Sequence, residues 1–253
     1  MPSDDAAERF PATHWSLVAR AGQADPEARR EALGELLARY VPALRAHLVY
    51  RKRLAPEKAD DVVQEFVADK ILRRDLIARA DRRLGKLRTY LLTALDRFVK
   101  NRLRDDSARK RAAGSGAMVG LEDDRLADPD DSSGSAPFEV TWARGVIAEA
   151  LRNMRAECER AGRMDVWGVF ECRLVAPLLD GAPPVGYGEL VSRFAFESPA
   201  QAANVLTTAK RMYARALRAA VGQYVDTDEE IESELNDLRQ ILARCGAAAH
   251  VVA

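Results

Sequence analysis

The sequence predicts an all-α protein in which a flexible linker joins two helical lobes, the second containing a helix-turn-helix. Three observations lead to this fold class. Ala, Leu, Arg and Glu, which favour helices, dominate the 253 residues. Apolar residues recur at helical spacing in several segments, while no alternating run of β-branched and aromatic residues stands out. One stretch rich in Gly, Ser, Asp and Pro lacks sustained periodicity and separates two groups of such segments.

Composition narrows the possible classes of protein. Hydrophobic residues make up 47% and charged residues 31% of the chain, as in ordinary globular proteins. No apolar stretch approaches the roughly 18 residues of a membrane span, and the acidic N-terminus lacks the apolar core of an export signal. The widely spaced Cys158, Cys172 and Cys245 form no C-x-x-C pair, which suggests reduced thiols. We therefore expect a cytoplasmic protein without a membrane span.

The formal net charge is zero, but basic and acidic residues are strongly segregated. Residues 51–111 hold 19 Lys and Arg against 10 Asp and Glu, whereas residues 121–139 and 226–239 each hold seven acidic residues and one arginine. A basic block beside acidic segments suggests a polyanionic partner, with the acidic segments competing for the same surface.

The first lobe, residues 10–111, opens with a helix predicted to begin near Pro26. Its apolar residues recur at helical spacing from Leu33 to Leu48. Pro42 lies inside this stripe and should kink or interrupt the helix, because proline lacks the N–H that the helical ladder needs.

Two further helices complete the first lobe. The stretch ADDVVQEFVADKIL (59–72) follows Pro56, which suits a first helical turn, and sets an apolar stripe against an acidic face. That face is either solvated or docks on a basic partner. The stretch 87–111 buries a second apolar stripe and carries many arginines and lysines elsewhere on its surface.

Residues 112–137 are predicted to form a flexible acidic linker, and residues 138–224 the second lobe. In this lobe a short helix YGELVSRF, a tight turn AFES and a longer helix from Pro199 give the pattern of a helix-turn-helix. The longer helix lacks acidic residues. Residues 225–253 form an acidic amphipathic extension.

Four stretches occur in an order and spacing that are more specific than each stretch alone. They are FPATHWSLV near the N-terminus, DVVQEFVADKIL, LRTYLL leading to RDDSARKR, and GYGELVSRF followed by SPAQAANVLTTAKRMYARALR. Together they resemble bacterial RNA polymerase sigma factors of the extracytoplasmic-function (ECF) class, and in particular a variant group common in planctomycete-like bacteria. The resemblance covers roughly residues 10–240.

The resemblance implies that the chain binds core RNA polymerase and directs promoter recognition and opening. In sigma factors a helix of the form D-x-x-Q-E-x-F docks on the basic clamp coiled coil of the largest polymerase subunit. The corresponding polymerase-binding residues here are Asp61, Gln64, Glu65 and Asp69. An acidic, hydrogen-bonding face would speed the encounter with a basic partner and fix its register.

The last helix of the first lobe would read the promoter's minus-ten element. Capture of a base flipped from the stack requires cations for the phosphates and an aromatic platform for the base. Tyr90 occupies the family's aromatic position, although at helical spacing it could equally pack in the core. The candidate cations, whose alternative is a solvated helix face, are Arg82, Arg83, Lys86, Arg88, Lys100, Arg104, Arg109 and Lys110.

The helix from Pro199 would enter the major groove at the minus-thirty-five element. Asn and Gln can hydrogen-bond adenine, Thr can touch a thymine methyl group, and cations can hold the backbone. The candidate residues are Gln201, Asn204, Thr207, Thr208, Lys210, Arg211, Arg215 and Arg218.

Some positions in this helix depart from the family. Ala203, Thr207 and Thr208 stand where the group usually has Arg, His and Arg, and in the first lobe Arg97 replaces an Asn. Fewer cations imply weaker, less salt-sensitive DNA binding. The alternative is a helix-turn-helix kept for packing or for contact with a protein.

The acidic extension is either a terminal helix docked on the second lobe or a shield over the basic DNA surface. An anti-sigma protein is a further partner that the family suggests. The three histidines are scattered, none near a cysteine at metal-ligand spacing, and no phosphate-binding glycine loop or nucleophile motif occurs. We therefore expect a protein that is not an enzyme and uses no cofactor or metal.

Two functions stay open. The first is a DNA-binding initiation factor that recruits core RNA polymerase to promoters and helps to open them. The second is a sigma-like adaptor or regulatory protein that binds polymerase or another protein without sequence-specific promoter reading. The replaced basic positions favour the second, and the arginine-rich first lobe favours the first, which we take as the prediction.

Overall fold

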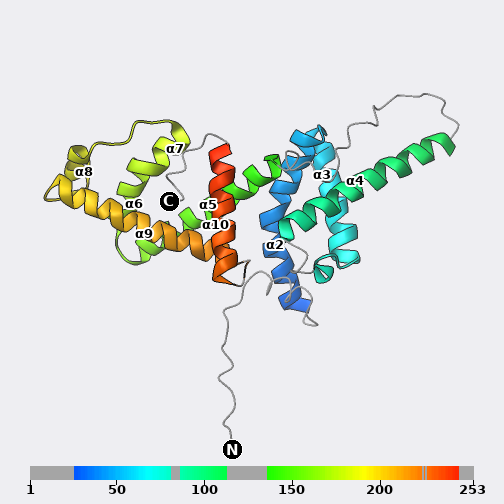
Figure 1. Cartoon of the computed structure of the whole chain (residues 1–253), viewed down its shortest axis with the longest axis horizontal. Helices are drawn as coiled ribbons and strands as arrows, with labels where there is room; N and C mark the ends of the chain where they lie inside the picture. The colour runs from blue at the N-terminus through cyan, green and yellow to red at the C-terminus, as the bar shows by residue number, and fades with distance from the viewer. Residues whose placement is uncertain (1–25, 81–85, 113–135, 224, 226, 245–253) are drawn as a thin grey trace, which may run out of the picture. The chain divides into compact units, whose positions relative to one another are not determined.

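The computed structural model confirms the all-α class (Figure 1). It describes residues 26–80, 86–112, 136–223, 225 and 227–244, and within these residues the regular structure is helical, without a strand. Every helix in this described part is too short or too polar to span a bilayer. The predicted linker, residues 112–137, lies almost wholly outside it.

The chain divides into two compact units, one ending at Gly145 and the other beginning at Val146. This boundary falls inside α5 (Ala136–Arg160), so the predicted second lobe shares its first helix with the first unit. Phe138 and Trp142 are buried in this first part of α5, and the Trp142 ring contacts Arg88 of α4, which links it to the first unit. The other helices of the first unit are α2 (Pro26–Ala46), η1 (His47–Arg51), α3 (Pro56–Phe66), η2 (Val67–Arg73), η3 (Ile77–Arg79) and α4 (Leu87–Ala112).

The α2 helix begins at the predicted residue and is not interrupted at Pro42. Leu36, Tyr40 and Leu44 are buried on both sides of the proline, and this packing keeps the chain on its helical course. A change of winding follows five residues later, where η1 forms a π-helical turn. Tertiary packing therefore outweighs the hydrogen bond that Pro42 cannot make.

The α3 helix packs on α4 through two aromatic rings. The rings of Phe66 and Phe98 meet edge to face, with their centroids 5.7 Å apart and their planes at 62°. Val62, Val63 and Ile71 are buried beside them, as the apolar stripe predicted. Pro56 occupies the first turn of α3, where its missing N–H costs nothing.

The second unit contains the predicted helix-turn-helix at the predicted residues. Its helices after α5 are α6 (Met164–Phe170), η6 (Glu171–Val175), α7 (Ala176–Asp180), α8 (Tyr187–Phe194), α9 (Pro199–Gly222) and α10 (Asp228–Arg244). Ala195 ends α8 in the left-handed conformation, with φ of 55°. Ser198 then caps α9, because its Oγ accepts a hydrogen bond from the backbone N–H of Gln201 at 3.2 Å. A Cβ added at Gly168 would lie 2.5 Å from the ring of Phe194, so any larger residue in α6 at this position would have to displace that ring of α8.

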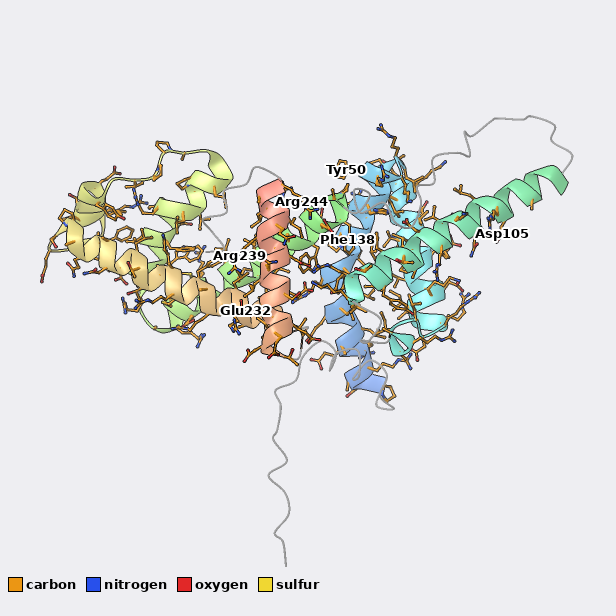
Figure 2. All side chains as sticks on the ribbon, viewed as in Figure 1. Tyr50, Asp105, Phe138, Glu232, Arg239 and Arg244 are labelled. Carbon is orange, nitrogen blue, oxygen red and sulfur yellow. The ribbon has the colours of Figure 1, made fainter. Side chains whose placement is uncertain are left out.

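The acidic extension forms α10, which packs on α9 (Figure 1). Leu235, Leu238 and Ile241 are buried, and Thr227 and Glu230 cap the helix reciprocally. Arg218 of α9 donates to Asp228 at 2.9 Å and to Glu232, which is labelled in Figure 2. The extension is therefore docked on the second unit, and because its acids pair with Arg218, a predicted DNA contact, shielding of the basic surface stays a prediction.

A matched pair of Tyr→Phe substitutions should change stability in opposite directions. The Tyr213 hydroxyl is buried beside Phe170 without a hydrogen-bond partner in the described structure, and burial raises its pKa, whereas Tyr90 donates to the Leu76 carbonyl at 3.2 Å. Tyr213→Phe should therefore raise the unfolding free energy of the second unit by about 1 kcal/mol, and Tyr90→Phe should lower that of the first by about 1 kcal/mol. Native-state hydrogen exchange reports each unit separately; a loss of stability in Tyr213→Phe would contradict the expectation.

Candidate protein-docking and nucleic-acid interfaces

The acidic face of α3 is only partly open to a partner. Asp61 and Gln64 are exposed, and neither has a hydrogen-bond or ion-pair partner among the described residues. Asp60, on the flank of this face, pairs with Arg45 of α2, whose Nη2 lies 3.1 Å from Oδ2 of Asp60. This hydrogen bond lowers the pKa of Asp60. The carboxylate is therefore committed within the unit.

The other two predicted polymerase-binding residues carry counter-charges of their own. Glu65 accepts a hydrogen bond from Nη1 of Arg102, one turn beyond Phe98 on α4. Asp69 lies near three cations, with Lys70 Nζ at 3.0 Å, Arg73 at 3.1 Å and Arg74 at 3.4 Å. The hydrogen bond from Lys70 and the surrounding positive charges lower the pKa of Asp69. Of the four residues, Asp61 and Gln64 alone keep their polar groups free within the described structure.

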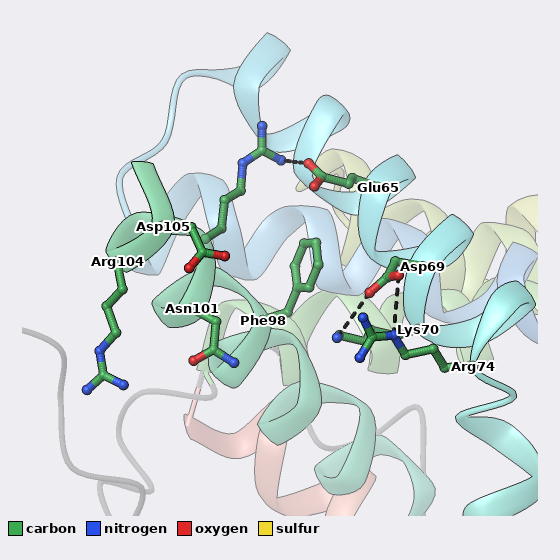
Figure 3. Close-up of a pocket in the computed structure, with 9 residues that line it drawn as sticks. Glu65, Asp69, Lys70, Arg74, Phe98, Asn101, Arg104 and Asp105 are labelled. Carbon is green, nitrogen blue, oxygen red and sulfur yellow. Dashed lines mark hydrogen bonds and ion pairs between the residues drawn. The ribbon is translucent and has the colours of Figure 1, made fainter. Parts of the chain in front are cut away.

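A polar groove of about 570 Å³ lies between these acids and α4 (Figure 3). The buried ring of Phe98 stands between Glu65 and Asp69, and Lys70 Nζ lies 5.5 Å from its centroid. The groove is lined by Glu65, Asp69, Lys70, Arg74, Phe98, Asn101, Arg102, Arg104 and Asp105. The sequence did not single out Arg102, Lys70 or Arg74, because nothing in it shows which acids they would meet.

The predicted DNA-binding cations of the first unit differ in their exposure. Arg88 is buried, and its guanidinium lies over the Trp142 ring, 4.4 Å from the centroid. It therefore does not face solvent as predicted; the cation–π contact with α5 holds it inside. Lys100 and Arg104 are exposed, and Lys86 is half-buried. Four other predicted residues cannot be placed, because Arg82 and Arg83 and the side chains of Arg109 and Lys110 lie outside the described part.

Tyr90 takes the packing position that the sequence left open. It is half-buried, and its hydroxyl donates to the Leu76 carbonyl. Burial raises its pKa. This hydrogen bond therefore links α4 to Leu76, which lies in the connection that follows η2.

One face of α9 is polar, exposed and free of acids. Asn204, Thr207, Thr208, Lys210 and Arg211 all lie on it. Both threonine hydroxyls donate to the backbone carbonyl four residues earlier, at 3.1 and 3.2 Å. They can still accept a hydrogen bond from an adenine or cytosine amino group.

Three predicted DNA contacts of α9 have partners within the chain. Gln201 Oε1 accepts from the backbone N–H of Glu197 at 2.6 Å, so this side chain caps the helix. Arg215 donates to Glu157 of α5 at 2.9 Å. Arg218 is held by α10. Lys210 and Arg211 remain as cations of this helix without a partner in the described part of the chain.

A buried histidine cluster, which the sequence did not reveal, joins α4 to η1. His47 Nε2 lies 2.9 Å from Oδ1 of Asp96, and Lys52 Nζ lies 3.1 Å from the same oxygen. Burial opposes ionisation of Asp96, but the hydrogen bonds and charges of His47 and Lys52 together outweigh it and lower the pKa of Asp96. Tyr50, in the same π-helical turn, is 72% exposed (Figure 2).

The described residues contain no cluster of His, Cys, Asp and Glu that could hold a metal ion. Comparison of the chain with protein-family models, with curated proteins and with solved structures finds no match.

The Asp96 carboxylate should make the first unit sensitive to acid. Because its folded-state pKa is lowered, the stabilisation is full above its ordinary value, about pH 4, and is lost as the pH falls through the lowered value. Asp96→Asn should lower the unfolding free energy at neutral pH by about 1 kcal/mol, and the difference from wild type should shrink at about pH 2.5. Urea unfolding at both pH values measures this. Asp61→Asn, at an exposed and unpartnered position, serves as the control; a difference that persists in acid would contradict the assignment.

Proposed function

We propose that the chain is a sigma-type transcription initiation factor of the ECF kind, which binds core RNA polymerase and directs it to promoter DNA. The observation that carries this proposal is the acid-free polar face of α9. A capped turn presents this face, and Lys210 and Arg211 stand beside Asn204, Thr207 and Thr208. A helix so presented suits entry into the major groove.

The residues of this face divide the work of binding DNA. Lys210 and Arg211 contact phosphates and set the register of the helix on the duplex. The Asn204 amide can pair with an adenine edge, and the threonine methyl groups can contact thymine methyls. In the first unit, Lys100 and Arg104 of α4 lie exposed and would neutralise the phosphates of the melted strand.

The same proposal assigns the two unpaired polar side chains of α3, Asp61 and Gln64, to polymerase binding. Asp61 and Gln64 can accept hydrogen bonds from a basic helix without first losing an internal partner. The charge of Asp61 would favour encounter, and the acceptor oxygens of both side chains would fix the register of docking. Promoter opening then relies on binding energy and involves no bond chemistry by the chain.

Removal of the two free cations of α9 should weaken DNA binding in a salt-dependent way. Duplexes are first selected from a random pool by the wild-type chain. Lys210→Gln/Arg211→Gln should then lower the affinity for the selected duplex about tenfold or more, and reduce the slope of log K against log salt by up to about 2. The control Arg152→Gln/Arg160→Gln removes the same charge from exposed positions on α5. Equal effects of the two variants would mean that α9 does not contact the phosphates.

Loss of the free α3 side chains should abolish polymerase binding. Asp61→Ala/Gln64→Ala should fail to co-purify with core RNA polymerase, while Glu35→Ala, which removes one negative charge from an exposed position on α2, should bind as wild type does. Circular dichroism checks that both variants are folded. Binding retained by Asp61→Ala/Gln64→Ala would rule out this docking face.

A second function is favoured by the internal partners of α9. Gln201 is used in capping, and Arg215 and Arg218 would each have to leave an ion pair before they could bind a phosphate. These contacts favour a sigma-like adaptor that binds polymerase without reading promoters. The two experiments above separate the functions, because an adaptor would bind polymerase and would select no duplex from the pool.

A further inference from the structure

The groove between α3 and α4 contains cations that the chain itself neutralises. Arg102 donates to Glu65, while Lys70 and Arg74 flank Asp69 (Figure 3). In each of these pairs, the acid is one that the sequence assigned to protein docking, and the cation lies beside α4. The charges available to a protein and to a polyanion are therefore not independent.

The two acids differ in their access to solvent. The Asp69 side chain is 17% exposed and is shared by three cations, so a partner cannot easily take it. The Glu65 side chain is 51% exposed and its partner Arg102 is 35% exposed. The Glu65–Arg102 pair is therefore the contact that an incoming charged molecule can break.

We propose that the Glu65–Arg102 ion pair couples the two surfaces of the first unit. A basic protein helix that takes Glu65 releases Arg102, which then binds a phosphate of single-stranded DNA at the groove. Conversely, a phosphate that takes Arg102 frees Glu65 for the basic helix. The inference rests on the proposed function and adds Arg102 to the residues that contact nucleic acid.

The geometry supports an exchange of partners. Arg102 lines a groove that has room for a phosphate, next to Asn101 and Arg104 on the same helix. Asn101 can donate an amide hydrogen bond to a phosphate oxygen, and the Arg104 side chain extends away from Phe98 (Figure 3). Arg102, Asn101 and Arg104 therefore line one groove, and α3 and α4 would keep their Phe66–Phe98 contact during an exchange.

Because exposed ion pairs contribute little free energy, the coupling is modest. Binding of either ligand should strengthen binding of the other by about two- to fivefold. This is enough to favour DNA capture after polymerase docking without preventing either event alone.

A double-mutant cycle on the full chain tests the proposal. The affinity for a fluorescent single-stranded DNA oligonucleotide is measured for wild type, Glu65→Gln, Arg102→Gln and the double variant. Glu57→Gln, at an exposed position in the first turn of α3, is the control for the loss of one negative charge. Circular dichroism verifies the fold of each variant.

The proposal predicts a non-additive cycle. Glu65→Gln should bind the oligonucleotide about two- to fivefold more tightly than Glu57→Gln, and this gain should disappear when Arg102 is also replaced. Equal affinities of Glu65→Gln and Glu57→Gln, or an additive cycle, would overturn the coupling while the proposed function stands. If wild type and Glu65→Gln both fail to bind, both the coupling and DNA capture by the first unit are rejected.

Discussion

The edge-to-face contact between Phe66 and Phe98 places the charges of the first unit. Glu65 precedes Phe66 in α3, and Arg102 lies one turn beyond Phe98 in α4, so packing of the two rings brings these ions together. Lys70, one turn after Phe66, reaches the Phe98 ring and Asp69 at once. Burial of apolar rings supplies free energy that exposed ion pairs cannot, because such pairs contribute at most about 1 kcal/mol each. The hydrophobic contact therefore determines the arrangement, and the ion pairs determine which charges remain available to a partner.

A similar division holds in the second unit. The inward stripe of α9 alternates small and large side chains, and Ala202 and Ala209 let the helix approach its neighbours while Leu206 and Tyr213 fill the core. The opposite face of α9 is exposed, and it carries the polar groups of the proposed DNA contact. Close approach also explains Gly168, where the Phe194 ring occupies the space of a side chain.

Helical periodicity and capping residues predicted much of this fold. The bounds of α8 and the start of α9 match the prediction, because Ser198, Pro199 and the apolar spacing are local signals. Partners distant in sequence were not predictable. Arg88 was expected on the surface, but its guanidinium lies over the ring of Trp142. The two residues are 54 positions apart in the sequence, on either side of the predicted linker. The acids of α3 were predicted to form a docking face, yet the sequence does not show that Arg45 and Arg102 would neutralise two of their carboxylates.

The balance of charge has a consequence for how the proposed factor would act. Arg215 is paired with Glu157, and Arg218 with Asp228 and Glu232, so only Lys210 and Arg211 offer a duplex a charge that needs no exchange of partner within the described residues. A reader with so few phosphate contacts binds DNA weakly by itself, and weak binding limits occupation of the many non-specific sites of a genome. Polymerase bound at Asp61 and Gln64 would supply further DNA contacts and would raise the effective concentration of the helix at the promoter. Internal neutralisation would thus keep promoter reading weak in the free chain and let docking strengthen it, which is the order of events that an initiation factor requires.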